Sequence, residues 1–308
     1  MINTLNEINK RASECPKEFI KECNNEYIES IIQIANRIES DDDIIIVAIA
    51  GPSGSGKTTT AHILRDKLEA LGETTEVVSL DDFYLPADDL PIMPDGSQDI
   101  ESVNALDIAL IKQCFQEIIS SGKASLPRYD FKTKSRIPND KQLDIGSHGI
   151  VVVEGLHAMN PLITDLVPHK NILKIYISVN RSVEDQNGVQ MLSSRQIRLV
   201  RRVLRDDRFR GSTATETLHL WNNVIDGERK YLYCFKDTAD IHLVTFHPYE
   251  LGVYRERFCK MRSTVNKNAP CYEYFIDTAN ALERFNAVDS NLVPSDSLIR
   301  EFIGDLNL

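Results

Sequence analysis

The sequence predicts an α/β fold in which a parallel β-sheet is covered by helices on both faces. Short runs rich in Val and Ile alternate with longer segments of helical periodicity. This alternation favours parallel strands, because each return to the same edge of a sheet needs a crossover connection. The expected strands are 43–50, 75–80, 149–154, 172–179 and 240–245, and the expected helices are 58–71, 103–120, 193–204 and 213–225.

The first strand runs directly into Gly51-Pro-Ser-Gly-Ser-Gly-Lys-Thr-Thr59, which matches G-x-x-x-x-G-K-[ST], the phosphate-binding loop. Its glycines allow backbone conformations that let successive N–H groups converge on phosphate oxygens. Lys57 adds a charge for the β- and γ-phosphates, and the Thr58 hydroxyl is a ligand for Mg²⁺. A plain glycine-rich turn is disfavoured, because strand, loop and helix stand in the order of a P-loop NTPase. The expected triphosphate site comprises Gly51, Ser53, Gly54, Ser55, Gly56, Lys57, Thr58 and Thr59.

Acidic residues follow two further predicted strands. Asp81 and Asp82 come after the strand at 75–80, and Glu154 ends the strand at 149–154. The carboxyl ends of parallel strands are where ligands bind in such folds. One carboxylate of the pair can accept the proton of a hydroxyl that attacks the γ-phosphate, and Glu154 can hold Mg²⁺ or its water shell. A solvated Asp-Asp turn is the alternative, which the phosphate loop disfavours.

Arginines are clustered between residues 195 and 211. At helical spacing Arg198, Arg202 and Arg205 share one face of the predicted helix. Guanidinium groups pair bidentately with phosphate oxygens, so a cluster in an acidic protein indicates a phosphate clamp. The alternative is an exposed face paired to nearby acids, and the phosphate loop favours the clamp.

Composition limits the function classes further. The chain has 308 residues and a formal net charge of −11, which argues against a nucleic-acid binder. The apolar run at 44–50 is too short to span a membrane, and residues 1–19 lack the apolar stretch of a secretory signal. Six scattered cysteines indicate free thiols in a reducing, cytoplasmic setting and no zinc site. The sequence leaves open whether the protein forms a homo-oligomer.

The chain divides into three expected parts. Residues 1–42 read as a helical N-terminal extension, and 43–265 as the P-loop domain. Residues 266–308 read as a helical C-terminal tail that packs on this domain, with helices at 272–285 and 295–303. Between 123 and 149 the pattern is less regular, which indicates a hairpin or lid on the substrate side.

Together these motifs resemble those of the uridine kinase and phosphoribulokinase family of P-loop kinases. The matching residues are GPSGSGKTT at 51–59, SLDDFY at 79–84, PRYDFKTKSR at 127–136, VVVEGLHAM at 151–159 and RLVRRVLRDDRFRG at 198–211. The stretches 217–240 and 293–304 look like a bacterial branch of uridine-kinase-like proteins. Members of that branch often carry N-terminal modules similar to parts of threonyl-tRNA synthetase, whereas here we expect only a short helical leader.

Carried over residue by residue, the resemblance implies the following roles. Asp81 is the general base, and Lys57, Arg205 and Arg210 are the further catalytic residues. Thr58 and Glu154 hold Mg²⁺. The substrate-binding residues are Asp81, Tyr84, Glu101, Tyr129, Phe131, Lys134 and Arg202.

Two of these positions depart from the family pattern. Glu101 replaces an Asp that holds sugar hydroxyls, and Lys134 stands where a His usually meets the pyrimidine edge. Lys donates hydrogen bonds but cannot accept them, so recognition of both uracil and cytosine is not expected.

The resemblance implies a kinase that uses ATP and Mg²⁺ to phosphorylate the 5′-hydroxyl of a nucleoside, with uridine the first choice. A second interpretation is a sugar-phosphate kinase like phosphoribulokinase, whose E-G-L-H run matches 154–157. The aromatic residues among the expected substrate contacts favour a flat base. A nucleotide-binding switch without turnover is a third interpretation, which the acids at 81 and 154 argue against.

Overall fold

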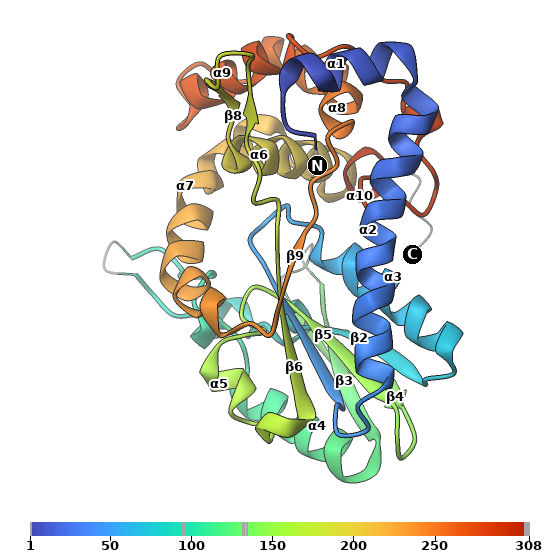
Figure 1. The fold of residues 1–308 in the computed structure, drawn as a ribbon. Coiled ribbons are helices and arrows are strands. Elements are labelled where there is room, and N and C mark those ends of the chain that lie inside the picture. Colours follow the sequence, from blue (N-terminus) through green and yellow to red (C-terminus); the bar gives the residue numbers. More distant parts are fainter. Residues whose placement is uncertain (1, 94–95, 131–132, 134, 305–308) are drawn as a thin grey trace.

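The structure is a computed structural model that describes residues 2–304 except 94–95, 131–132 and 134. A parallel sheet with the strand order β2-β5-β1-β6-β9 forms its centre (Figure 1). Register places Glu154 beside both Ile49 and Ser79, so three strands end at the same edge of the sheet. These strands are β1 (Ile46–Ala50), β2 (Thr75–Ser79), β5 (Ile150–Glu154), β6 (Ile172–Ser178) and β9 (Ile241–Val244).

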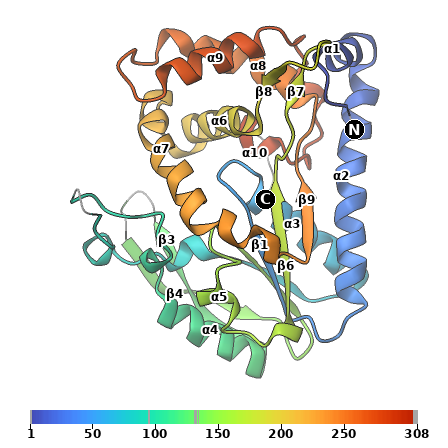
Figure 2. The ribbon, with the colours of Figure 1, turned by 60° about the vertical axis from the view of Figure 1, so that its left-hand side comes forward.

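Helices cover the sheet on both faces, as predicted. Every residue of β1 is buried, and successive side chains belong to different cores because strand side chains alternate in direction. Figure 2 shows the two layers around the sheet. One core contains residues of α2 (Pro16–Glu39), α3 (Lys57–Leu71), α6 (Ser194–Arg205) and α7 (Ala214–Tyr231); the other contains residues of α4 (Ile108–Ser121) and α5 (Pro161–Thr164).

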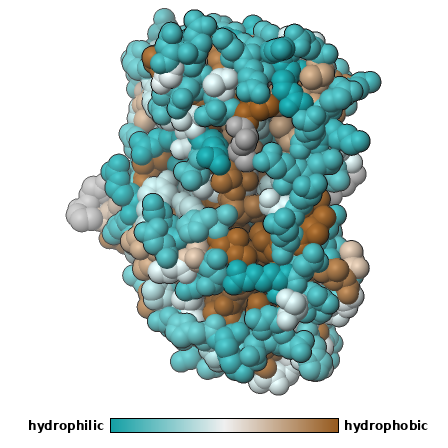
Figure 3. All heavy atoms as spheres, in the orientation of Figure 1, coloured by the Kyte–Doolittle hydropathy of each residue, from teal (hydrophilic) through white to brown (hydrophobic). Residues whose placement is uncertain are grey.

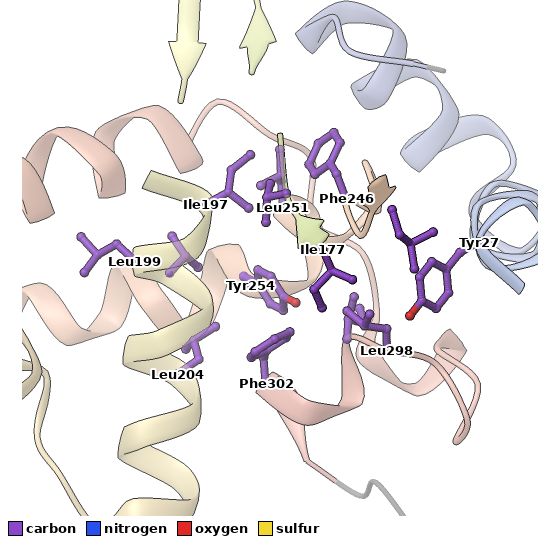
Figure 4. Close-up of a cluster of buried hydrophobic side chains, with 14 of the residues drawn as sticks. Tyr27, Ile177, Ile197, Leu199, Leu204, Phe246, Leu251, Tyr254, Leu298 and Phe302 are labelled. Carbon is purple, nitrogen blue, oxygen red and sulfur yellow. The ribbon is translucent and has the colours of Figure 1, made fainter. Parts of the chain in front are cut away.

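The first and last parts of the chain lie together. Figure 1 shows α1 (Leu5–Glu14) close to α8 (Glu250–Lys260) and α9 (Tyr272–Leu282). The Asn9 side chain donates to the Arg284 carbonyl at 2.8 Å and accepts from the Asn286 N–H at 2.7 Å. Both parts contribute side chains to the core beneath β6, where Tyr27 and Leu298 lie near Ile177 (Figure 4). All six cysteines are free thiols.

The predicted elements are found, with differences at their ends. The segment 123–149 contains a hairpin of β3 (Lys123–Asp130) and β4 (Ser135–Asp144). α4 begins only at Ile108 because the Asp107 carboxylate caps it, accepting the Leu110 N–H at 3.0 Å. Of the helix expected at 295–303, only α10 (Arg300–Ile303) is α-helical. The short hairpin of β7 (Val183–Glu184) and β8 (Gln190–Leu192) and helix α8 were not predicted.

The surface in Figure 3 is mostly hydrophilic, with apolar side chains gathered along its middle. This band coincides with a groove of about 620 Å³ between α2 and the edge strand β9, whose lining includes Ile34, Leu243 and Phe246. Within the described ranges, no helix is long and apolar enough to cross a membrane.

Candidate active site

The loop 51–56 joins β1 to α3 with the backbone geometry that phosphate binding needs. Gly54 and Gly56 have φ angles of 73° and 88°, in the left-handed region that favours glycine. A Cβ at Gly51 would collide with the backbone oxygen of Ile177 in the neighbouring strand. The loop therefore passes close to β6 and leads into the N-terminus of α3, where backbone N–H groups favour an anion.

Two buried arginines support this loop from behind. Arg201 binds Glu250 through two bonds of 2.7 and 2.9 Å and donates to the Gly54 carbonyl at 3.2 Å. Arg198 donates to Glu228 at 2.6 Å and to the Ser53 carbonyl at 3.1 Å. The sequence grouped Arg198 with Arg202 and Arg205 as a phosphate clamp, whereas in the structure its side chain is 4% exposed and paired with Glu228. Sequence reasoning did not single out Arg201 at all.

Glu228 is a second scaffold residue that the sequence did not reveal. Its carboxylate is fully buried and accepts the Ser53 N–H at 2.8 Å as well as the Tyr233 hydroxyl at 3.0 Å. Glu228 thus fixes both the loop backbone and Arg198.

Lys57 lies inside the phosphate loop. Its ammonium donates to the Pro52 carbonyl at 3.3 Å. Burial lowers the pKa of Lys57, and the nearby carboxylates of Glu154 and Asp81 partly oppose that shift. A bound phosphate would favour the charged form further, so the position suits a residue that binds β- and γ-phosphates.

Glu154 is held where a metal ion would meet the phosphates. Its Oε1 accepts from the Thr58 hydroxyl at 3.2 Å and from the Ser79 hydroxyl at 2.8 Å. Burial raises the pKa of Glu154 to about 7, the charge of Asp81 adds to the rise and Lys57 opposes it. Among the described residues no cluster of three or more His, Cys, Asp or Glu exists, but Mg²⁺ needs only one or two carboxylates beside phosphate oxygens. The oxygen donors of Thr58 and Glu154 fit this ion.

The two carboxylates of the SLDDFY run, Asp81 and Asp82, have different surroundings. Asp82 accepts the backbone N–H of Tyr129 at 3.1 Å and so ties the β3–β4 hairpin to this loop. Asp81 follows Ser79, whose hydroxyl accepts the Asp81 N–H at 3.3 Å. After burial, the charge of Asp81 is the next cause that raises the pKa of both Glu154 and Tyr84. Asp81 therefore lies between the phosphate loop and the pocket described below, while Asp82 anchors the hairpin.

Three predicted arginines converge on one buried carboxylate, Asp206. Arg205 donates to it at 2.8 Å, Arg202 lies 3.3 Å from it and Arg210 lies 3.7 Å from it. Arg202 also donates to the Ser53 hydroxyl at 2.6 Å, at the rim of the phosphate loop. The charge of Arg205, followed by burial, lowers the pKa of Arg210. Glu301 is a further carboxylate near this cluster, 4.0 Å from Arg205.

A pocket of about 640 Å³ opens beside these groups. It is lined by Tyr84, Tyr129, Glu101 and Arg202, four of the predicted substrate contacts. The two tyrosine rings lie 5.5 Å apart between centroids. Burial raises the pKa of Glu101 to about 7, and Arg202 opposes this rise. Phe131 and Lys134, also predicted here, lie outside the described residues.

Helix α7 forms the opposite wall of the pocket, which the sequence did not reveal. Its contribution includes Leu220, Val224, Lys230 and Tyr231. A Cβ on Gly227 would collide with the Glu101 side chain, so this glycine lets α7 approach closely. Gly227 lay beyond the helix expected at 213–225, and the Glu101 side chain that it meets is distant in sequence.

His157 contacts this wall from outside the pocket lining, through Tyr231. Its ring stacks edge-on against Tyr231 at 5.8 Å between centroids. The side chain is buried, and burial lowers the pKa of His157 to about 4. It is therefore neutral near pH 7 and acts as a packing residue.

Comparisons with known proteins identify the family of the chain. Residues 46–248, more than half of the chain, match the model of the "Phosphoribulokinase / Uridine kinase family". The chain is 26% identical to a uridine kinase of Ureaplasma parvum over 59% of its own length and 78% of that protein. It is 27% identical to the inorganic pyrophosphatase TTM2 of Arabidopsis thaliana over 68% of this chain, but the match spans only 27% of TTM2. A solved structure of a possible uridine kinase from Bacillus stearothermophilus covers 70% of this chain and 98% of its own, with 16% identity and a TM-score of 0.47. By its family match, the chain is a member of the phosphoribulokinase and uridine kinase family of P-loop kinases.

Proposed function

We propose that the protein transfers the γ-phosphate of ATP to the 5′-hydroxyl of a nucleoside, with uridine as the preferred substrate. The observation that carries the proposal is the pocket beside Asp81, which combines two tyrosine rings with a buried carboxylate. Flat rings suit an aromatic base, and Glu101 suits the hydroxyls of a sugar. The names of several relatives as uridine kinases support the choice of uridine.

The charge of the pocket argues against a phosphorylated acceptor. Among its described lining residues, Asp99, Glu101 and Asp226 are acidic, whereas the basic side chains are Arg202 and Lys230. The charge of Arg202 is already balanced in part by Asp206, which lies 3.3 Å away. A sugar phosphate would place its charge next to these acids with few free cations, which costs binding energy. A neutral nucleoside meets no such cost.

The proposed mechanism assigns one task to each group. Asp81 accepts the proton of the 5′-hydroxyl as that oxygen attacks the γ-phosphorus. Lys57, Arg205 and Arg210 stabilise the charge on the migrating phosphoryl group, and Arg202 holds the rim of the phosphate loop. Thr58 and Glu154 would hold Mg²⁺, which supplies charge neutralisation at the phosphates when bound.

We propose, in addition, that residues 43–265 act as the kinase unit, with 1–42 and 266–308 as extensions packed on it. Residues of all three parts belong to one hydrophobic core, which supports the packing of both extensions on the kinase unit. Recognition of the base by Lys134 stays a prediction. Its donors would favour the O4 edge of uracil over the amino edge of cytosine.

One assay tests the function. ATP consumption is measured with Mg²⁺ against uridine, cytidine, purine nucleosides, their deoxy forms and pentose phosphates, with Asp81→Asn as the inactive control. We expect turnover with nucleosides, highest with uridine, and none with pentose phosphates. Turnover with pentose phosphates alone would favour the phosphoribulokinase-like alternative. ATP binding without turnover on any acceptor would favour the nucleotide-binding switch.

A further inference from the structure

The C-terminal segment, residues 293–304, contacts the phosphate-binding loop directly. Leu298 packs against Gly56, where an added Cβ would lie 2.9 Å from its Cδ1 atom. Glu301 accepts a hydrogen bond from the Thr59 hydroxyl at 2.7 Å. Its other carboxylate oxygen lies 4.0 Å from Arg205. A carboxylate thus stands between the first turn of α3 and the arginine cluster.

The core on either side of Glu301 holds this carboxylate in place. Figure 4 shows Phe302 beside Tyr254 and Leu298 near Tyr27. Phe302 is fully buried, and its ring lies 5.0 Å from the Arg201 guanidinium. The Glu301 side chain itself is 14% exposed. Its contact with Thr59 is therefore part of the packed structure.

This carboxylate lies beside the expected site of the triphosphate. With the β- and γ-phosphates of a bound donor at the loop and Lys57, its α-phosphate would approach the first turn of α3, where Thr59 follows Thr58. Glu301 already occupies the Thr59 hydroxyl, and its negative charge reaches Lys57 and Glu154 as one of the smaller influences there, after burial. A phosphate that arrives at this place meets a like charge and an occupied donor.

We propose that Glu301 sets the affinity for the donor nucleotide: binding of the triphosphate replaces the Glu301 carboxylate at the Thr59 hydroxyl with a phosphate oxygen. The carboxylate keeps Arg205 as its remaining partner. The inference depends on the proposed function only in requiring a nucleoside triphosphate as the donor. The C-terminal segment thus has two roles, one in the hydrophobic core and one in binding of the donor nucleotide.

The test is direct binding of ATP, ADP and adenosine by calorimetry to the full-length protein, without an acceptor. Glu301→Gln keeps an oxygen for the Thr59 hydroxyl but removes the charge, so packing is retained. Asp296→Asn removes one charge from an exposed position in the same segment and is the matched control. We expect Glu301→Gln to bind ATP about tenfold more tightly, ADP less so and adenosine unchanged, with Asp296→Asn like the wild type.

Each other result contradicts the inference. Unchanged or weaker ATP binding by Glu301→Gln would mean that the carboxylate positions Thr59 and does not oppose the phosphate. Equal tightening by Asp296→Asn would indicate a general effect of net charge, and equal tightening for adenosine a steric one. If neither the wild type nor Glu301→Gln binds ATP, the proposed function is overturned as well. Thermal unfolding of each variant verifies the fold, and Glu301→Ala carries the same prediction should the Gln form not fold.

Discussion

The donor side of the site is one continuous stretch of chain, residues 51–59, whereas the acceptor side is assembled from segments around 84, 101, 129 and 227. Behind the donor side stand two ion pairs that are almost wholly buried, Arg198 with Glu228 and Arg201 with Glu250. The acceptor side has a hairpin tied by Asp82 and a helix, α7, that closes over Glu101. In the proposed function, fixed backbone would meet the phosphates, and side chains from separate segments would meet the acceptor. We infer that changes on the donor side affect every substrate alike, and changes on the acceptor side affect the choice among substrates.

Asp81, where the two sides meet, is expected to give the largest effect. Asp81→Asn keeps the shape but cannot take a proton, and loss of a general base costs about 10²–10⁴-fold in kcat. Asp82→Asn should lower kcat far less, because Asp82 binds the Tyr129 N–H. Steady-state kinetics of both variants at saturating substrate measures the difference. A severe loss only in Asp82→Asn would assign the base to the other carboxylate.

Removal of the buried ion pair behind the loop should lower the stability of the protein far more than removal of a surface ion pair. Arg201→Ala leaves Glu250 buried without its partner, which costs about 3–5 kcal/mol of unfolding free energy. Arg257→Ala breaks a half-exposed pair with Asp207 and should cost about 0–1 kcal/mol. Urea unfolding at pH 7 measures both. Similar small losses in the two variants would mean that the scaffold of the donor side is not held by this pair.

Lys57→Ala tests the donor side without disturbing its support. Lys57 begins α3 beside the loop, and in the proposed mechanism its positive charge acts on the migrating phosphoryl group. We therefore expect a loss of about 10²–10³-fold in kcat for every acceptor. Lys112→Ala, at an exposed position of α4, is the control. The assay is ATP-dependent turnover with uridine and with a second, slower nucleoside. A folded Lys57→Ala protein with turnover near that of the wild type would contradict the site, and unequal losses for the two nucleosides would contradict the separation of the two sides.

The difference between the two sides also explains what the sequence could and could not predict. The phosphate loop and the strand-end acids Asp81 and Glu154 were predictable because their chemistry depends on local order: strand, loop, helix. Helical spacing grouped Arg198 with the clamp, but whether an arginine turns inward depends on a buried partner such as Glu228, distant in sequence. The same holds for α7 as a pocket wall and for Glu301 beside Thr59, since both contacts join segments that only the fold brings together.

The smallest predicted effect concerns the acceptor side and pH. Burial raises the pKa of Glu101 to about 7 from an ordinary value near 4.5, so the folded protein binds the extra proton more tightly than the unfolded chain. This group therefore adds stability at low pH, and that stability is lost as pH rises from about 4.5 to about 7. The same ionisation should strengthen its bond to sugar hydroxyls, since a charged acceptor gains about 1 kcal/mol over a neutral one. We expect the KM for the nucleoside to fall by roughly threefold between pH 6 and 8. The KM for ATP is a separate readout, because burial also raises the pKa of Glu154, at the expected metal site, to about 7. In Glu101→Gln the nucleoside KM should not change with pH over this range. If it changes as much as in the wild type, the pH dependence belongs to another group.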